Sequence, residues 1–253
     1  MAGDASATRR TERPTGRNMG EVTSQPTSDA PLDGRRSAAA TRRRKREREI
    51  LAATRALFDA RGVRDAQIED IARLVGINRA IIYRHFSGKE ELFALTLAGY
   101  LEELATRLRA ADDLTAAPKD RLRAITGAFV DYGLDYPAFV DCALTLMHRP
   151  GPELLEEVSE GAMYRLGRGI STCLATVVGA VRAGVESGVF HTEDVDLLAN
   201  TLYASGLGGL QLARVGLLVK EAGPGIPTTA RLSAQRVKEH LVASSVAMAV
   251  GAP

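Results

Sequence analysis

The sequence is poor in the residues that stabilise small secreted or β-rich proteins. It has two cysteines, Cys142 and Cys173, no tryptophan, and only 5% aromatic residues among 253. Two cysteines provide neither a disulfide framework nor a four-ligand zinc site, and we interpret them as buried thiols in a reducing cytoplasm. Scarce aromatics disfavour a β-sandwich. The hydrophobic content of 45% is instead typical of many small Ala- and Leu-rich helices.

Long apolar runs and excess charge are also missing. No run approaches the ~20 residues of a membrane span, and no apolar stretch follows the N-terminal arginines, so we expect neither a membrane segment nor a signal peptide. The net charge is only +2, but residues 1–48 hold twelve basic and six acidic side chains, a local net charge of +6. Such a local basic excess is typical of a nucleic-acid-binding surface.

Catalytic patterns are absent from the sequence as well. We find no Ser-His-Asp arrangement, no glycine-rich phosphate loop and no paired catalytic carboxylates. The scattered His148, His191 and His240 do not have metal-ligand spacing with the two cysteines. We therefore expect a protein that is not an enzyme and that has no metal site and no cofactor.

The chain divides into three parts by composition. Residues 1–40 are polar, contain three prolines and lack apolar periodicity, which predicts a disordered tail; Met1 and Met19 both remain candidate start residues. From Thr41 onward the periodicity is helical, with no strand pairs joined by hairpin turns. We predict an all-α fold of about nine helices, with a three-helix DNA-binding domain at 41–93 and a helical domain at 94–253. Its expected later helices are Lys119–Asp135, Ala138–Met147, Glu153–Glu186, Thr192–Glu221 and Ala230–Ala249.

Residues 67–86 have the features of a helix-turn-helix. Gly76 supplies the positive φ that the turn requires, and Ala72, four residues earlier, allows the two helices to approach closely. Asn78 is a good N-cap for the next helix. Ser87 with Glu90 is predicted to form a capping box that opens a fourth helix. In such a unit the second helix lies in the major groove, with its N-terminal side chains at base edges.

The candidate DNA contacts follow from this arrangement. Arg79 and Arg84 can donate to guanine or phosphate, and the basic run before the first helix can neutralise phosphates. A solvated charge cluster is the alternative for the basic run, and packing is the alternative for His85. The full candidate set is Arg43, Arg44, Lys45, Arg46, Gln67, Asn78, Arg79, Ala80, Ile81, Tyr83, Arg84, His85 and Lys89.

Several strings in this region together resemble the DNA-binding domain of the TetR family of bacterial transcriptional regulators. They are Ile50-Leu51-Ala52-Ala53, Leu57-Phe58, Gly62, Ile68-Glu69-Asp70-Ile71-Ala72, Val75-Gly76-Ile77-Asn78-Arg79, Ile82-Tyr83-Arg84-His85-Phe86 and Lys89-Glu90-Glu91-Leu92-Phe93. Two positions differ from the family pattern. Gln67 stands where Thr or Ser is common, and Ala80-Ile81 replaces a common Gly-Thr pair. Ile81 is therefore expected to meet a thymine methyl or to pack.

The resemblance implies a cytoplasmic repressor that acts as a homodimer. Its last two helices would pair with those of a second subunit in a four-helix bundle, and Gly206, Gly208 and Gly209 would allow close helix approach. The partners implied are double-stranded DNA with a palindromic operator and a small-molecule effector. An activator on the same fold, and a helical ligand-binding protein that has lost DNA binding, remain as alternatives.

The resemblance also implies an effector pocket in the helical domain. Each candidate residue taken alone is more typical of plain core, but the set indicates an apolar cavity with few charged groups. Such a cavity would suit a lipophilic or acyl effector. The candidates are Phe129, Tyr132, Phe139, Cys142, Leu146, Met147, Met163, Leu166, Cys173 and Tyr203.

Overall fold

The computed structural model describes residues 30–251, with side chains from Ser37 onward. The chain divides into two units between Thr41 and Arg42. In the first unit, helix α1 (Ala30–Arg61) already begins at Ala30, so the prediction that residues 30–40 are disordered is wrong. Pro31 lies in the first helical turn, where its missing N–H is not needed, and the alanines at 38–40 favour a helix. The predicted tail at 1–29 lies outside the described residues.

The second unit opens with three helices that form the head. The remainder of α1, α2 (Ile68–Val75) and α3 (Arg79–His85) enclose a small core that includes the buried Ile50, Phe58, Ile71 and Ile82. Gly62, with φ +83°, ends α1 as predicted, and its N–H donates to the Phe58 carbonyl at 2.8 Å.

Helix α4 (Lys89–Ala111) connects the head to the helical domain. The predicted capping box is wrong, because the Ser87 N–H donates to the carboxylate of Glu91 rather than Glu90. The Ser87 hydroxyl instead donates to the Glu157 carbonyl at 3.2 Å. The predicted domain boundary at residues 93 and 94 falls inside α4, which is buried along most of its length.

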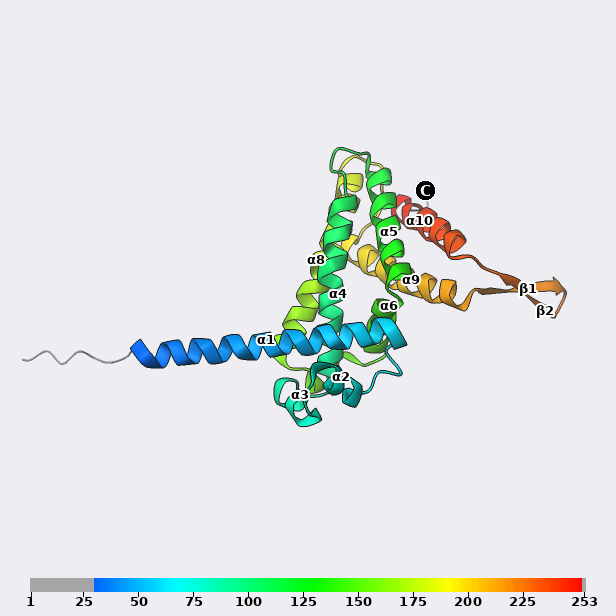
Figure 1. Cartoon of the computed structure of the whole chain (residues 1–253). Coiled ribbons are helices and arrows are strands. Elements are labelled where there is room, and N and C mark those ends of the chain that lie inside the picture. Colours follow the sequence, from blue (N-terminus) through cyan, green and yellow to red (C-terminus); the bar gives the residue numbers. More distant parts are fainter. Residues whose placement is uncertain (1–29, 252–253) are drawn as a thin grey trace, which may run out of the picture. The chain divides into compact units, whose positions relative to one another are not determined.

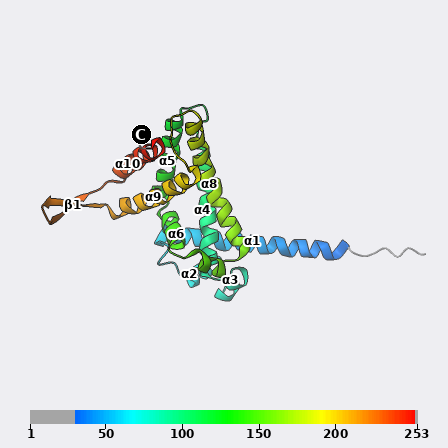
Figure 2. The same ribbon diagram turned by 180° about the vertical axis from the view of Figure 1, so that it is seen from behind.

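Six further helices complete the helical domain. Helix α4 runs beside α8 (Glu160–Glu186), and α5 (Pro118–Asp135) packs on α4 and on the last helix, α10 (Ala234–Val250) (Figures 1 and 2). Helix α6 (Pro137–Met147) contacts both α4 and α9 (Val195–Val215). The short α7 (Gly151–Glu157) lies near the start of α4.

The predicted long helix 153–186 is broken at Val158 and Ser159. Ser159 caps α8 by accepting the Ala162 N–H at 3.3 Å, and it also donates to the Glu91 carboxylate. The described residues therefore contain ten helices rather than about nine. The predicted Thr192 cap is also wrong, since Asp194 accepts the Leu197 N–H at 2.8 Å and begins α9.

A β-hairpin stands where a helix end and a loop were predicted. Gly216, with φ +70°, ends α9, and β1 (Leu217–Gly223) pairs antiparallel with β2 (Ile226–Arg231). Pro224 and Gly225 form its turn, which is the order that a type II turn favours. The described residues are otherwise helical, and the predicted all-α class is confirmed with this one exception.

Helix α8 alone among the described helices is long and apolar enough to cross a membrane by length and composition. It is not an uninterrupted apolar run, because Arg165, Arg168 and Arg182 lie along it. In the structure Leu166, Cys173 and Ala180 of α8 are buried in the same core as α4 and α9. Helix α8 thus serves as a packing helix of this bundle.

Two of the three glycines expected to allow close helix approach do so. A Cβ on Gly206 would collide with the ring of Phe129 in α5, and one on Gly209 would collide with Leu241 in α10. Gly208 faces open space. The small residues of α9 therefore bring it close to α5 on one side and to α10 on another.

Two glycines of α8 offer a test of this packing. A Cβ on Gly184 would overlap the fully buried ring of Phe190, whereas a Cβ on Gly179 meets nothing within 4 Å. We expect Gly184→Ala to lower the free energy of unfolding by about 1–3 kcal/mol, as overpacking does. Gly179→Ala should raise it by about 0.5–1 kcal/mol, because glycine is a poor helix former. Urea denaturation followed by circular dichroism measures both, and equal effects would contradict the packing described.

Candidate DNA-binding surface and effector cavity

The turn between α2 and α3 exposes the first residues of α3. Gly76, with φ +71°, ends α2, and the Ile77 N–H returns to the Ala72 carbonyl at 2.9 Å. Asn78 then caps α3, its Oδ1 accepting the Ile81 N–H at 3.0 Å. Because Ile71 and Ile82 are buried between the two helices, the opposite side of α3 faces solvent. The sequence predicted both the turn and this cap.

Arg79 and Tyr83 lie together on that exposed side. The Arg79 guanidinium donates to the Glu69 carboxylate at 2.8 Å and to the Tyr83 hydroxyl at 3.3 Å, and its Cζ lies 5.3 Å from the centre of the Tyr83 ring. These interactions, that with Tyr83 first, raise the pKa of Arg79. Arg79 is therefore a permanent cation, pre-oriented at the start of α3. The predicted contact of Arg79 with a base or phosphate would require it to release Glu69.

The basic run of α1 lies beside the other side of α3. Arg42, Arg43, Lys45 and Arg46 line an open groove of about 430 Å³ together with Glu49 of α1 and with Ile81, Arg84 and His85 of α3. Arg43 also pairs with Glu47 at 2.9 Å, and Arg46 with Glu49 at 2.8 Å. The two acidic residues moderate the field of the groove. The cations remain in excess.

The remaining candidate DNA contacts differ in their setting. His85 is half-buried, and its Nδ1 lies 3.5 Å from the Glu47 carboxylate of α1. These contacts agree with packing, the alternative given for this residue. Gln67 is the exposed N-cap of α2 but makes no side-chain capping bond. Lys89 begins α4, with its ammonium 5.0 Å from the centre of the Phe93 ring. Arg44 and Ala80 are exposed. Contact of these residues with DNA stays a prediction.

A cavity of about 350 Å³ lies in the helical domain. Helices α4, α5, α8, α9 and α10 enclose it, with walls that include Leu104, Ile125, Phe129, Val177 and Leu202. Of the residues predicted for an effector pocket, Phe129, Cys173 and Tyr203 line this cavity. Burial raises the pKa of Tyr203 and that of Cys173, the latter to about 12. Both groups therefore stay neutral at physiological pH.

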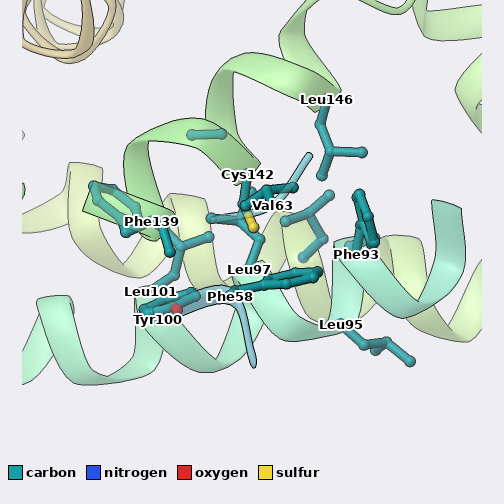
Figure 3. Close-up of a cluster of buried hydrophobic side chains, with 14 of the residues drawn as sticks. Phe58, Val63, Phe93, Leu95, Leu97, Tyr100, Leu101, Phe139, Cys142 and Leu146 are labelled. Carbon is teal, nitrogen blue, oxygen red and sulfur yellow. The ribbon is translucent and has the colours of Figure 1, made fainter. Parts of the chain in front are cut away.

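The other predicted pocket residues lie elsewhere. Phe139, Cys142 and Leu146 of α6 pack against Phe58 of α1 and Tyr100 of α4 (Figure 3). Tyr132 and Leu166 are also buried core, Met163 is partly buried against it and Met147 is exposed. The Phe139–Leu146 group thus joins the head to the helical domain instead of lining the cavity.

The described lining of the cavity carries hydroxyl groups and the imidazole of His240, but no carboxylate, ammonium or guanidinium group. Thr126 donates to the Ser245 hydroxyl at 3.1 Å, and Ser245 donates to the Val242 carbonyl at 2.9 Å. Ser244 lies 3.4 Å from Nε2 of His240. Within the described part of the chain, no Asp, Glu, Lys or Arg lines this cavity. An apolar wall with a few neutral polar groups is the usual composition of a small-molecule site.

Comparison with known proteins identifies the family. Residues 50–96 match the model of bacterial regulatory proteins of the tetR family. The transcriptional repressor KstR2 of Mycobacterium tuberculosis is 39% identical over 158 residues, which cover 60% of this chain and 74% of KstR2. The chain belongs to the TetR family.

Two other likenesses extend this assignment. The transcriptional activator FasR of Mycolicibacterium smegmatis is 32% identical over 102 residues, 40% of this chain and 47% of FasR. The chain thus matches about half the length of that relative. The structure of RolR with resorcinol has a TM-score of 0.61 at 18% identity and covers 83% of this chain and 90% of that chain. At that identity the likeness concerns the fold alone.

The sequence did not point to the share of α10 in the cavity of this TetR-family protein. Leu241, Ser244, Ser245 and Met248 all line it, and their spacing of three, four and seven residues is a helical face. This spacing could have indicated the cavity, whereas the resemblance assigns the last helix to dimerisation alone. The sequence does not distinguish Leu104 and Leu108 of α4 from ordinary core residues, because α4 is apolar on most of its faces.

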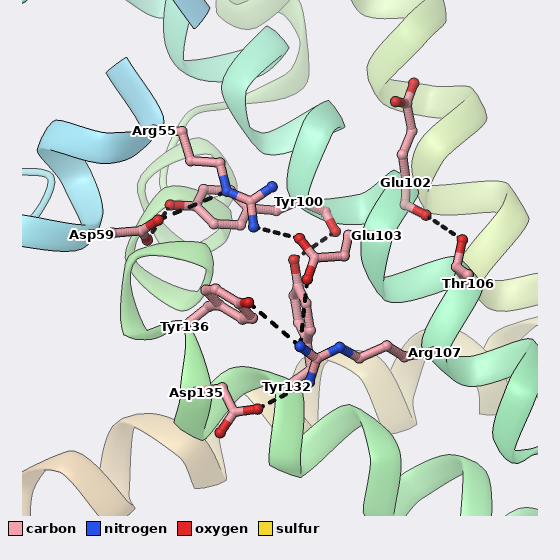
Figure 4. A network of polar contacts seen from close by, with 10 residues as sticks. All are labelled: Arg55, Asp59, Tyr100, Glu102, Glu103, Thr106, Arg107, Tyr132, Asp135 and Tyr136. Atoms are coloured by element: carbon pink, nitrogen blue, oxygen red, sulfur yellow. Dashed lines mark hydrogen bonds and ion pairs between the residues drawn. The ribbon is translucent and has the colours of Figure 1, made fainter. Parts of the chain in front are cut away.

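A polar network connects the head of this TetR-family protein to the walls of the cavity (Figure 4). Arg55 of α1 donates to Glu103 of α4 at 2.5 Å, and its guanidinium lies 4.3 Å from the centre of the Tyr100 ring. Arg107 of α4 continues the network, since it contacts both Glu103 at 3.4 Å and Asp135 of α5 at 3.0 Å. A displacement of α5 or α4 therefore reaches α1 through charged contacts.

The exposed start of α3 generates a direct test. We expect Arg79→Ala to weaken binding to the operator by about tenfold or more and to alter base preference, because a bidentate arginine contact reads a base edge. Arg123→Ala removes one exposed cation from α5 and should leave affinity within about twofold. Fluorescence anisotropy on operator DNA and on single-base variants measures both effects. Equal affinity of Arg79→Ala and the parent protein would show that Arg79 is not part of the recognition surface.

Proposed function

We propose that this protein is a homodimeric transcriptional repressor that releases a palindromic operator when a small neutral molecule enters the cavity. The observation that carries DNA binding is the exposed N-terminal turn of α3 beside the basic groove of α1. A head that had lost DNA binding would have no need to keep Arg79, Arg84 and the α1 cations exposed together. Their retention favours a working DNA-binding head over a ligand-binding protein that has lost this function.

The outer face of α9 supports the proposed dimer. Leu197, Thr201, Ser205, Gly208 and Leu212 recur every three or four residues along α9 and are all exposed, Leu197 by 64%. A surface stripe of leucines and small residues on a helix is typical of a helix–helix interface. Two copies joined along α9 and α10 form a four-helix bundle. The α3 helices then enter successive major grooves, about 34 Å apart.

The proposed effector is neutral, mainly apolar, and carries one or two hydroxyl or carbonyl groups. Burial of a charge in a cavity without a partner charge is costly, which disfavours ionic molecules. The hydroxyls of Thr126 and Ser244 offer hydrogen bonds to such polar groups. RolR was solved with resorcinol, and KstR2 is described as a ketosteroid regulator. Neutral phenols and ketosteroids are therefore the first molecules to test.

The location of the cavity explains how an effector would act. Three of its lining residues, Ser205, His240 and Met248, are exposed, so the cavity opens between α9 and α10 on the proposed dimer face. Its inner walls, α4 and α5, carry the network that ends at Arg55. An effector that binds more tightly to one separation of the heads shifts the dimer to that separation. Release requires that the favoured separation does not fit the operator.

Repression and activation are separated by one experiment. Operators are first selected from genomic DNA fragments with the purified protein and confirmed by anisotropy. Transcription from the selected promoter is then measured in vitro. We expect the protein to lower transcript yield. A rise would support an activator, for which the likeness to FasR is the specific argument, and failure to retain any fragment would overturn the DNA-binding proposal.

A cavity-filling variant tests the effector site. Ala199 lines the cavity and is buried, whereas Ala175 of α8 is exposed. We expect Ala199→Leu to abolish the rise in melting temperature that the best-binding phenol or ketosteroid gives to the parent, because the added carbons occupy the space that the ligand requires. Ala175→Leu should keep that rise. If Ala199→Leu binds the same molecule as well as the parent does, the effector site lies elsewhere.

The network at Arg55 predicts a variant with altered coupling. Arg55→Ala removes the contact between α1 and Glu103. We expect the same molecule still to bind, but the factor by which it lowers operator affinity should be about tenfold smaller than in the parent. Arg109→Ala, on the exposed side of α4, is the matched control. Anisotropy titrations with and without the molecule give the ratio. An unchanged ratio in Arg55→Ala would mean that this contact does not transmit the response.

A further inference from the structure

The hairpin between α9 and α10 is longer than the connection requires. The Leu232 N–H donates to the Gly216 carbonyl at 2.9 Å, which already brings the end of α9 to the start of α10. Residues 217–231 leave this junction and return to it. A short turn would join the two helices equally well. We therefore expect residues 217–231 to have a role other than connecting α9 to α10.

The hairpin also has little to stabilise it within its own chain. Its strands pack chiefly on each other, and they project beyond the ends of α9 and α10 in both views (Figures 1 and 2). The Glu221 carboxylate accepts the Gly225 N–H at 2.6 Å and fixes the turn. An isolated two-stranded hairpin is only marginally stable in water. Its ordered register from Leu217 to Arg231 therefore needs a further surface.

One face of the hairpin carries exposed apolar side chains of β1 among polar ones. Leu217 and Val219 point to the same face because strand side chains alternate, and this face also holds their partners Arg231 and Thr229 and the pair Glu221 and Pro227. Val219 is 79% exposed and Leu217 is 46% exposed. Ile226, at the turn, is 61% exposed. Aliphatic side chains gathered on a projecting strand pair are typical of a surface that another protein covers.

The exposed Leu217 and Val219 continue the stripe of the proposed dimer interface. Leu212 and Val215, in the last turns of α9, are 41% and 59% exposed and lead directly to Leu217 and Val219. β1 has seven residues, and at about 3.3 Å per residue it extends roughly 23 Å. Helices in contact lie only about 8–10 Å apart. An arm that starts at the interface is therefore long enough to cross the neighbouring subunit's helices.

We propose that the hairpin Leu217–Arg231 is an arm that packs on the second copy of this chain, outside the four-helix bundle. This inference rests on the proposed homodimer. Twofold symmetry gives each dimer two such arms, each lying on the other subunit. The arms add apolar area to the interface and hold the two cavities, which open on the same face, between the subunits.

Site-specific photo-crosslinking tests the arm directly. A benzophenone amino acid is placed at Val219, on the face of Leu217, or at Thr228, on the opposite face of the same hairpin. Equal amounts of ¹⁴N- and ¹⁵N-labelled protein are mixed, irradiated and analysed by mass spectrometry. We expect Val219 to give mixed-isotope dimers and Thr228 to give few. Cross-links from Val219 that stay within one chain, or that form only with added operator DNA, would overturn the proposal.

Sedimentation equilibrium supplies an independent readout. We expect Val219→Asp to raise the dimer dissociation constant by about tenfold or more, whereas Thr228→Asp should change it by less than about twofold. Leu212→Asp, in the α9 stripe, reports on the bundle itself. If Leu212→Asp gives monomers while Val219→Asp dimerises like the parent, the arm inference fails and the dimer stands. A parent protein that is monomeric at all concentrations would overturn both.

Discussion

The continuous burial of α4 is the constraint on which the remaining structure depends. Its first turns belong to the core that also contains Phe58 and Ile82 of the head, and its last turns form a wall of the cavity through Leu104 and Leu108. Because one rigid helix serves both cores, the head cannot change its orientation without altering the packing around the cavity. The Arg55–Glu103–Arg107 contacts reinforce this connection on the surface of the same helix.

The parts of the fold that the sequence predicted are those fixed by one or two residues with special backbone roles. Gly62, Gly76 and Asn78 each have few alternatives at a helix end or turn, and they located the head correctly. The errors arose where helical composition hid a break. Ser159 is an ordinary N-cap inside an otherwise helical pattern, and Pro31 lies in the first turn of a helix, within a segment that was predicted to be disordered. In both places the outcome depended on the position of a residue within a turn, which composition does not reveal.

The cavity and the hairpin were harder to predict for a different reason. Residues on α6 such as Phe139 and Cys142 have the same chemistry as true cavity residues, and only the packing of α6 against α1 separates them. The hairpin begins with Leu-Leu-Val-Lys-Glu, which suits a helix end, while its strand signals lie later, in Pro224-Gly225 and Thr228-Thr229. Local preference was divided there, and the turn decided it.

Helix α9 is a wall of only one layer. Ala199, Tyr203 and Gly206 face α5 and the cavity, whereas Leu197, Gly208 and Leu212 face outward. In the proposed dimer, an effector would thus lie against the inner side of α9 and the neighbouring subunit against its outer side, with the mouth of the cavity between α9 and α10 opening toward that subunit. Gly206 has no side chain, and the ring of Phe129 already occupies the space beside it. At this point α9 packs directly on α5 and has no side chain that could change rotamer to make room. Bulk that the cavity cannot accommodate would move the helix itself, and the size of a bound molecule would then be converted into the spacing of the two subunits.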